Sequence, residues 1–323
     1  MLKKLAHKFI PALDVLLYPV TYAAALWFLF IRKYGVQKMP ASRSAFWKIG
    51  VFPIRDHYYE PLFNPKHLNL KTRDKRNLPG INLNEDTQLR LLSEFSYQDE
   101  LAAIPAERES GKLHYYYNNP SFFAGDAEVL YNMIRFFKPK RIIEIGSGNS
   151  TLMMLQAVNR NKQIDNSYDC TIKCIEPYEV PWLEESGVEV IRKMVQDIDL
   201  SFFQELEEND ILFIDSSHII RPQGDVLYEY LELLPTIKKG VIIHIHDIFT
   251  PRDYLNENFD NYVVFLNEQY MLEALLSAND SFEIISAVNY LKHDHFDALA
   301  KACPVLAKNP DKEPRSIWIR KNK

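Results

Sequence analysis

The sequence predicts an α/β fold, a doubly wound and mostly parallel sheet with helices on both faces. Two observations indicate it. From residue 140 onward, short apolar runs alternate with helical segments, as in strands joined by crossover helices. The first run leads into a glycine-containing turn and a helix cap, in the stretch RIIEIGSGNST at residues 141–151. A turn of this kind is typical of α/β proteins that bind nucleotides at the carboxyl edge of the sheet.

Composition and charge fit a globular protein. The chain has 323 residues, 47% of them hydrophobic, which is enough for one large domain with additional elements. Its formal net charge is −5 at pH 7, so no overall positive field favours nucleic acid as a partner. The three cysteines include no C-x-x-C pair, which argues against a disulfide framework and a structural zinc site.

The N-terminus departs from this pattern, and residues 1–35 are predicted to form a separate hydrophobic helix. Residues 15–31 carry no charge and have basic side chains on both flanks, but they are near the lower length limit for a membrane span. Asp14 and Pro19 interrupt a clean span. Two alternatives stay open, in which residues 9–31 either cross or lie in a membrane, or form a helix buried in the protein. No small-residue cleavage site follows the run, which argues against a cleaved signal peptide.

Residues 36–120 are predicted to form an irregular N-terminal arm or cap. They are rich in Pro, Asn, Arg and Tyr and contain few long periodic runs. Within them, residues 51–63 (VFPIRDHYYEPLF) mix aromatic and charged side chains. That composition suits substrate contacts and, equally, the surface packing of an irregular segment. Apolar spacing predicts one helix at residues 83–95 and another at 126–137.

The remaining residues, 121–323, are predicted to form the sheet domain. Its strands are expected at 141–146, 171–176, 188–192, 210–215, 240–246, 282–288 and 315–320, and its later helices near 150–159, 180–186, 201–207, 223–234 and 267–278. A long segment with three prolines separates the last two strands, so their pairing can be parallel or antiparallel. The histidines of Lys292-His-Asp-His-Phe296 are expected in a solvated polar turn.

Acidic side chains and histidines stand at the ends of five successive predicted strands. They are Glu144 in IEIGSG, Glu176 in IEPY, Asp197 in QD, Asp215 and His218 in FIDSSH, and His244, His246 and Asp247 in IHIHD. In open α/β sheets, ligands bind beyond the carboxyl ends of the strands. One acid at such an end is common, but acids at five successive ends indicate a binding site.

From Phe122 to Arg320 the chain resembles class I S-adenosylmethionine-dependent methyltransferases. IEIGSGNST is similar to their first motif, IEPY to their acidic second motif, and FIDSSH and IHIHD to their fourth and fifth strand ends. The similarity is greatest to bacterial small-molecule enzymes of the catechol O-methyltransferase-like and sugar-modifying kind. The resemblance implies a Rossmann-like sheet of seven strands with an antiparallel final hairpin. It also implies S-adenosyl-L-methionine as cosubstrate and a small-molecule hydroxyl, such as that of a sugar or glycan intermediate, as acceptor.

The strand-end residues fit the chemistry of S-adenosylmethionine. Gly146 and Gly148 let the backbone approach the ligand closely, and Glu176 can accept both ribose hydroxyls. Asp197 is expected to meet the adenine amino group, and Glu144 to support the methionine amino group directly or through the loop. The predicted cofactor-binding set is Glu144, Gly146, Ser147, Gly148, Asn149, Ser150, Glu176, Pro177, Tyr178, Asp197 and Asp215. Local pairing of Glu144, surface exposure of Glu176 and helix capping by Asp197 are the alternatives.

Methyl transfer to a hydroxyl requires removal of its proton, by a general base or by acidification on a metal ion. His218, His246 and Asp247 are the predicted catalytic residues, with one of the two histidines as base. Asp215 and Asp247 are candidate ligands for a divalent metal such as Mg²⁺. The resembled catechol-type site has an acidic pair where this chain has His246-Asp247, which leaves metal dependence open. Two alternatives stay open. Asp215 could only orient the cosubstrate, and His244 or His246 could lie in the core.

A second function class stays open, an NAD(P)-dependent oxidoreductase on a Rossmann-like fold. It requires a G-x-G-x-x-G turn, where this chain has Thr151 in place of the third glycine. A membrane-associated binding protein without turnover is the third alternative. We expect a cytoplasmic enzyme, at the inner face of the membrane if residues 9–31 bind it, because S-adenosylmethionine is cytosolic. The acceptor and the oligomeric state stay open.

Overall fold

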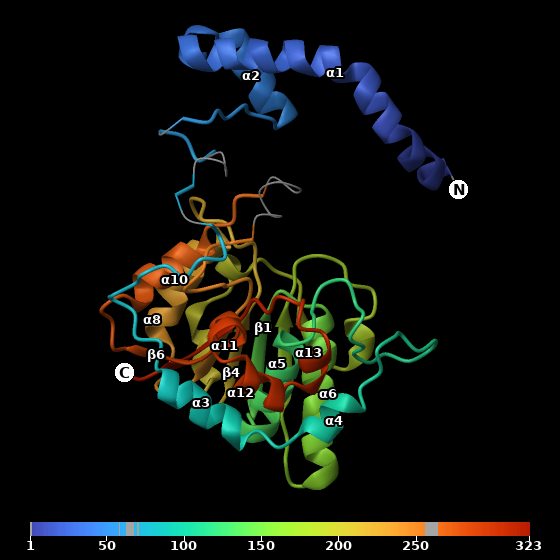
Figure 1. Ribbon diagram of the computed structural model, residues 1–323, viewed down its shortest axis with the longest axis vertical. Coiled ribbons are helices and arrows are strands. Elements are labelled where there is room, and N and C mark those ends of the chain that lie inside the picture. The colour runs from blue at the N-terminus through green and yellow to red at the C-terminus, as the bar shows by residue number, and fades with distance from the viewer. Residues whose placement is uncertain (1, 58, 63–67, 70, 256–263) are drawn as a thin grey trace. The chain divides into compact units, whose positions relative to one another are not determined.

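A computed structural model describes residues 2–57, 59–62, 68–69, 71–255 and 264–323. The chain divides into two compact units, residues 1–70 with 259–265 and residues 71–258 with 266–323. The second unit holds the whole sheet (Figure 1). The three-part organisation expected from the sequence (1–35, 36–120 and 121–323) stays a prediction.

The first unit is dominated by helix α1 (Leu2–Tyr34), followed by the single turn η1 (Val36–Lys38) and helix α2 (Pro40–Ile49). From Phe9 to Tyr34, α1 has the length and hydropathy of a membrane-crossing helix, and only 6% of its most apolar stretch is buried. Most of its described aliphatic and aromatic side chains are exposed within this unit, although Ile31 is buried.

The second unit contains a seven-stranded sheet in the order β3-β2-β1-β4-β5-β7-β6. Its strands are β1 (Arg141–Ile145), β2 (Thr171–Ile175), β3 (Glu189–Ile191), β4 (Ile211–Ile214), β5 (Ile242–Ile245), β6 (Phe282–Ala287) and β7 (Ile317–Lys321). The first five are parallel, and β7 runs antiparallel to both β5 and β6. The predicted fold class and all seven strands are confirmed, within about two residues at each end.

Burial on both faces explains the near-continuous apolar sequences of the central strands. Every residue of β4 and β5 is buried, including the isoleucines at both ends of each strand. Helices α5 (Asp126–Phe137) and α6 (Asn149–Ile164) pack together on one face, beside the α11–α13 group (Figure 1). The helices that follow β4 and β5 cover the other face: α7 (Asp225–Tyr228), the π-helical η6 (Glu229–Leu233), α8 (Leu234–Thr236) and α10 (Glu268–Leu276). The arm contributes α3 (Glu85–Glu94) and α4 (Gln98–Ala102).

Two predicted helices are only single 3₁₀ segments, η3 (Glu184–Ser186) and η5 (Leu200–Glu205). In η5 the Asp199 side chain accepts from the Ser201 backbone N–H, while its carbonyl accepts from the Phe202 N–H. These short-range bonds give a tight turn in place of an α-helix. A third 3₁₀ turn, η4 (Val195–Asp197), lies between them.

The predicted polar turn at the His-Asp-His sequence is wrong. Between β6 and β7 the chain forms helices α11 (Val288–Asp294), α12 (Phe296–Ala302) and α13 (Pro304–Lys308). His293 lies in the last turn of α11, and its Nε2 lies 2.9 Å from the Glu313 Oε2. Buried Val288, Leu291 and Leu299 hold these helices to the core, a burial that the charged neighbours obscure in the sequence.

Candidate functional site

The site lies where β1 and β4 are neighbours although their helices cover opposite faces of the sheet. Such a switch point opens a crevice at the carboxyl edge of the strands. Gly146 follows β1 there with φ +77°, and a Cβ at this position would lie 1.9 Å from the Asp215 carbonyl oxygen. Only glycine fits this close approach. Gly148 differs, because a Cβ there would meet nothing within 4 Å.

A cavity of about 220 Å³ opens at this edge and gathers several predicted residues. It is lined by Ile145, Gly146, Ile175, Glu176, Pro177, Tyr178, Met194, Val195, Gln196, Asp215, Ser216, Ser217, Arg221 and Asp225. The structure does not bring Asp197 to this cavity, because its side chain is exposed on η4. Gln196 lines the cavity in its place, and its buried Oε1 has no hydrogen-bond partner among the described residues. Sequence reasoning missed Gln196 because only its charged neighbour carried a signal.

Glu176 connects the loop after β1 with the loop after β2, and both loops contribute to the cavity. Its Oε2 accepts from the Ser147 backbone N–H at 3.0 Å, and its Oε1 accepts from the Tyr178 N–H at 2.9 Å. Each carboxylate oxygen has two lone pairs, so both keep capacity for ligand hydroxyls. The side chain is buried, 8% exposed, and is not the surface acid of the sequence-based alternative.

Glu144 is fully buried and bonds within the fold. It accepts hydrogen bonds from the Ser150 and Thr151 hydroxyls, at 2.6 and 2.5 Å, and from the Cys174 thiol at 3.3 Å. Burial raises the pKa of Glu144 to about 7, against these hydrogen bonds, which act to lower it. Since Glu144 does not line the cavity, its effect on a ligand passes through the loop that it ties to α6. Asn149, at the start of α6, donates to the Ser121 hydroxyl at 2.8 Å.

His218 is the centre of a charged cluster beside the cavity. Its Nε2 lies 3.1 Å from the Asp215 Oδ1 and 3.5 Å from the Asp247 Oδ2, and its Nδ1 lies 2.7 Å from the Glu268 Oε2. Burial acts to lower the pKa of His218, but the hydrogen bonds to Asp215 and Glu268 and the charge of Asp247 raise it well above its ordinary value. The three carboxylates therefore favour the imidazolium form of His218.

Glu268 was missed by sequence reasoning although it orients His218. It begins α10, is fully buried, and accepts a second hydrogen bond from the Tyr230 hydroxyl at 3.0 Å. The backbone N–H groups of Asn267 and Glu268 donate to the His218 carbonyl. An acid in the first turn of a helix is common, and nothing in the sequence links Glu268 to a residue fifty positions earlier.

Backbone strain marks the same cluster. His218 and Asp247 have φ values of 59° and 53°, in the left-handed region that only a few per cent of non-glycine residues adopt, Asp and His more often than most. Residues held in such conformations occur often at active sites, where the surrounding structure enforces them. The strain is consistent with a functional role for the two strand-end loops.

The two strand histidines occupy different environments. His244 is fully buried, stacked on Phe213 at 3.9 Å and against Trp318 at 4.6 Å. Burial, with a smaller effect of His246, lowers the pKa of His244 well below its ordinary value, so it is a neutral core histidine. The His246 ring lies against Phe122 at 5.3 Å. Its buried Nδ1 has no hydrogen-bond partner within the described part of the chain.

The predicted metal ligands do not form an open pair. The His218 imidazole stands between Asp215 and Asp247, so a divalent cation between the carboxylates would displace or face an imidazolium. Burial acts to raise the pKa of Asp215, yet nearby His246 and the hydrogen bond to His218 lower it to about 2. In the described ranges no group of three or more His, Cys, Asp or Glu side chains could hold a metal. In this structure the His218 ring thus occupies the position between the two carboxylates that a divalent cation would take.

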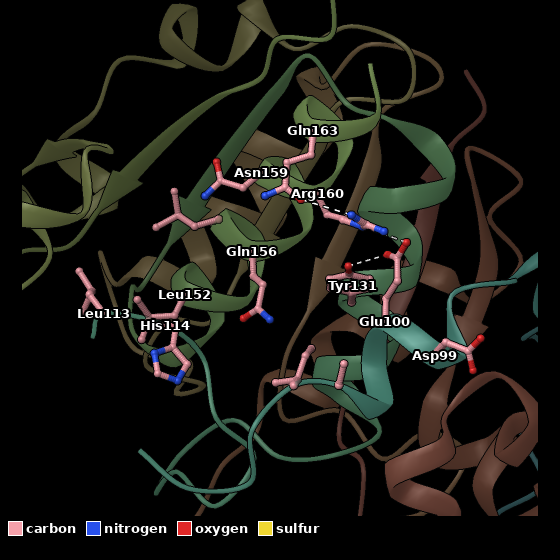
Figure 2. Close-up of a pocket in the computed structure, with 13 residues that line it drawn as sticks. Asp99, Glu100, Leu113, His114, Tyr131, Leu152, Gln156, Asn159, Arg160 and Gln163 are labelled. Carbon is pink, nitrogen blue, oxygen red and sulfur yellow. Dashed lines mark hydrogen bonds and ion pairs between the residues drawn. The ribbon is translucent and has the colours of Figure 1, made fainter. Parts of the chain in front are cut away.

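A larger cavity, of about 610 Å³, lies between α4, α6 and the loop before Tyr115 (Figure 2). Glu100 and Arg160 lie on one side of it and His114 on the other. Although burial opposes it, hydrogen bonds from Arg135, Tyr131 and Arg160 lower the pKa of Glu100 to about 2. This cavity contains none of the predicted site residues.

Sequence comparison finds related proteins. A family model described as a methyltransferase domain matches residues 143–248. An uncharacterised protein of Archaeoglobus fulgidus is 36% identical over 173 residues, which cover 50% of this chain and 76% of that protein. Because that relative is archaeal, the comparison gives no support to the bacterial origin expected from the resemblance.

Structure comparison finds methyltransferases at low similarity. The MycE methyltransferase of the mycinamycin biosynthetic pathway, in complex with Mg, SAH and mycinamycin VI, is 14% identical with a TM-score of 0.31, covering 59% of this chain and 47% of that chain. A structure described as cmcI-N160 SAH is 16% identical with a TM-score of 0.26, covering 46% of this chain and 75% of that chain. The chain thus spans about half the length of the MycE structure.

Proposed function

Because this chain belongs to the class I S-adenosylmethionine-dependent methyltransferases, we propose that it methylates a hydroxyl group of a small molecule. The observation that carries the proposal is the switch-point cavity beside a cluster of His218 and three carboxylates. Family membership gives no support to the NAD(P)-dependent alternative. A sugar or glycan intermediate is the acceptor class that the resemblance favours.

The cavity residues suit the parts of the methyl donor. Glu176 would accept the ribose hydroxyls, and the unpartnered Gln196 Oε1 would accept from the adenine amino group. The loop after Gly146, anchored by Glu144, would hold the methionine portion through its backbone. S-adenosylmethionine supplies the methyl group when it is bound. The contribution of the loops is then to orient it for in-line attack.

Proton removal from the acceptor is assigned to His246. The carboxylates around His218 raise its pKa well above the ordinary value, which makes it a poor proton acceptor near neutral pH. The His246 Nδ1 has no hydrogen-bond partner among the described residues, and the charges of Asp215 and Asp247 would stabilise the imidazolium that it becomes. His218 and Asp247 are then positioning residues. A metal role for Asp215 and Asp247 stays a prediction that a chelation assay tests.

Calorimetric titration with S-adenosylhomocysteine tests the donor site. We expect the intact protein to bind it, and Glu176→Ala to weaken binding about tenfold or more, the typical value of hydrogen bonds to a charged group. Glu179→Ala is the matched control, since Glu179 is an exposed acid three residues away. Absence of binding to the folded protein would overturn the proposal, as would equal loss in both variants.

We also propose that α1 associates with a membrane. Its exposed apolar side chains include Val15, Leu16 and Trp27, and basic residues flank them on both sides. Flotation with phosphatidylglycerol-containing vesicles should carry the full chain to the top of a gradient. Replacement of Leu16 and Trp27 by Asp should abolish flotation without changing S-adenosylhomocysteine binding. Flotation unchanged by these substitutions would contradict the proposal.

A further inference from the structure

We infer that a second cavity, next to Asp247, holds the acceptor through an anionic group, a phosphate or a carboxylate. The inference rests on the proposed methyl transfer and adds the charge class of the acceptor. It comes from the position of this cavity, its charges and its aromatic wall.

The second cavity has a volume of about 470 Å³, within the usual range for small-molecule sites. Four parts of the chain that are distant in sequence form it: the end of the arm, the loop after residue 122, the loop after β5, and the segment before β7. Its lining residues are Lys71, Thr72, Arg73, Phe123, Leu255, Asp311, Lys312, Glu313 and Arg315.

The second cavity is connected to the donor cavity through the charged cluster. Arg315, in its wall, lies 3.4 Å from the Asp247 Oδ1, and the other oxygen of Asp247 lies 3.5 Å from the His218 Nε2. On the other side of His218, Asp215 lines the donor cavity. Because transfer requires the acceptor oxygen in line with the methyl group at contact distance, an acceptor anchored by its anion in the second cavity would extend past Asp247 and bring a distant hydroxyl to the donor.

Positive charge exceeds negative charge in the lining, with four basic and two acidic side chains. One acid, Glu313, is already compensated: Arg73, Lys292 and His293 contact it at 2.6, 2.8 and 2.9 Å. Although burial opposes the shift, the contacts from His293 and Lys292 lower the pKa of Glu313 to about 2. The negative charge of Glu313 is thus compensated by Arg73 and also by Lys292 and His293, which do not line the cavity.

The lysines of the lining have no such compensation. Among the residues that the structure describes, neither the Lys71 nor the Lys312 ammonium forms an ion pair with a carboxylate. Asp311, the second acid, reduces the positive charge without cancelling it. An anionic ligand would gain charge-assisted hydrogen bonds from these groups, whereas a cationic ligand would be repelled.

An aromatic wall stands beside the cations. The Lys312 Nζ lies 5.0 Å from the centre of the Phe123 ring, and the Arg315 Cζ lies 5.6 Å from it. Cation–π contacts of this kind hold the two charges near the ring. A ring that carries an anionic substituent, such as a uronic acid or a sugar phosphate, matches a flat apolar wall with adjacent cations.

Three probes that share one skeleton test the inference: 4-nitrophenyl β-glucoside, its 6-phosphate and 4-nitrophenyl β-glucuronide. Binding to the full chain, saturated with S-adenosylhomocysteine, is measured by calorimetry at low and high salt. We expect at least one anionic probe to bind about tenfold more tightly than the neutral glucoside, and the preference to fall with salt. The preferred probe shows whether the anion is a phosphate or a carboxylate.

Charge reversal at Lys312 provides the matched comparison. Lys312→Glu should remove the preference for the anion, while Lys308→Glu, at an exposed lysine on α13 outside the cavity, should keep it. Equal binding of all three probes, no binding of any of them, or an anion preference that survives Lys312→Glu would overturn the inference. If S-adenosylhomocysteine itself does not bind, the proposed function fails instead, so the two failures are distinguishable.

Discussion

The donor side and the acceptor side of the site are built differently. Most of the donor cavity comes from short turns that directly follow β1, β2 and β4, together with the turn after β3. The acceptor cavity combines residues 71–73, Phe123, Leu255 and residues 311–315. Turns attached to parallel strands are fixed by the sheet itself, whereas the acceptor wall depends on how the arm and the β6–β7 connection pack. The donor cavity can therefore be recognised from sequence motifs, and the acceptor cavity cannot.

The largest effect is expected from a substitution in the donor cavity, at Gly146. Gly146→Ala would place a Cβ 1.9 Å from the Asp215 carbonyl oxygen at a positive φ, so β1 and β4 would have to separate. We expect a loss of about 3 kcal/mol or more in the free energy of unfolding, measured by denaturant titration. Gly148→Ala, with open space around its Cβ, is the control. Equal stability of the two variants would contradict the close-approach argument.

The next effect falls on the reaction between the two sides. His246→Ala should lower kcat about 100- to 10,000-fold, the range usual for a general base, and leave S-adenosylhomocysteine binding unchanged. His114→Ala, in the cavity of Figure 2, should have no such effect on kcat. A kcat within threefold of the parent protein would exclude His246 as the base.

A smaller effect is expected from the residue that holds the cluster in place. Glu268→Gln removes a charge 2.7 Å from the His218 Nδ1, so the pKa of His218 should fall, and kcat should fall by about tenfold to 100-fold. Nuclear magnetic resonance titration of His218 measures the first change and steady-state kinetics the second. Glu232→Gln, at an exposed acid on η6, is the control. An unchanged pKa of His218 in Glu268→Gln would contradict the conclusion that Glu268 acts on His218.

The smallest effect concerns stability against pH. A carboxyl whose pKa is raised to about 7 in the folded state stabilises the fold below its unfolded pKa, and this contribution is lost as pH rises towards 7 and above. The free energy of unfolding should therefore drop less between pH 5 and 8 in Glu144→Gln than in the parent protein, by about 1–3 kcal/mol. Denaturant titration at each pH measures this drop. Glu128, also buried with a pKa raised to about 7, should account for part of the remaining slope. A Glu144→Gln variant with the full slope would contradict the raised pKa.

The sequence by itself determined the seven strands, because buried strands require apolar runs that few other elements share. It also determined which strand ends carry acids, and hence Glu176 and Gly146. Only the tertiary structure decided the pairing of His218 with Glu268, the exchange of Asp197 for Gln196, and the core position of His244. The acceptor cavity is likewise a feature that only the tertiary structure decided. Each depends on which distant segments come into contact, and residues that meet only through packing leave no spacing in the chain by which to recognise them.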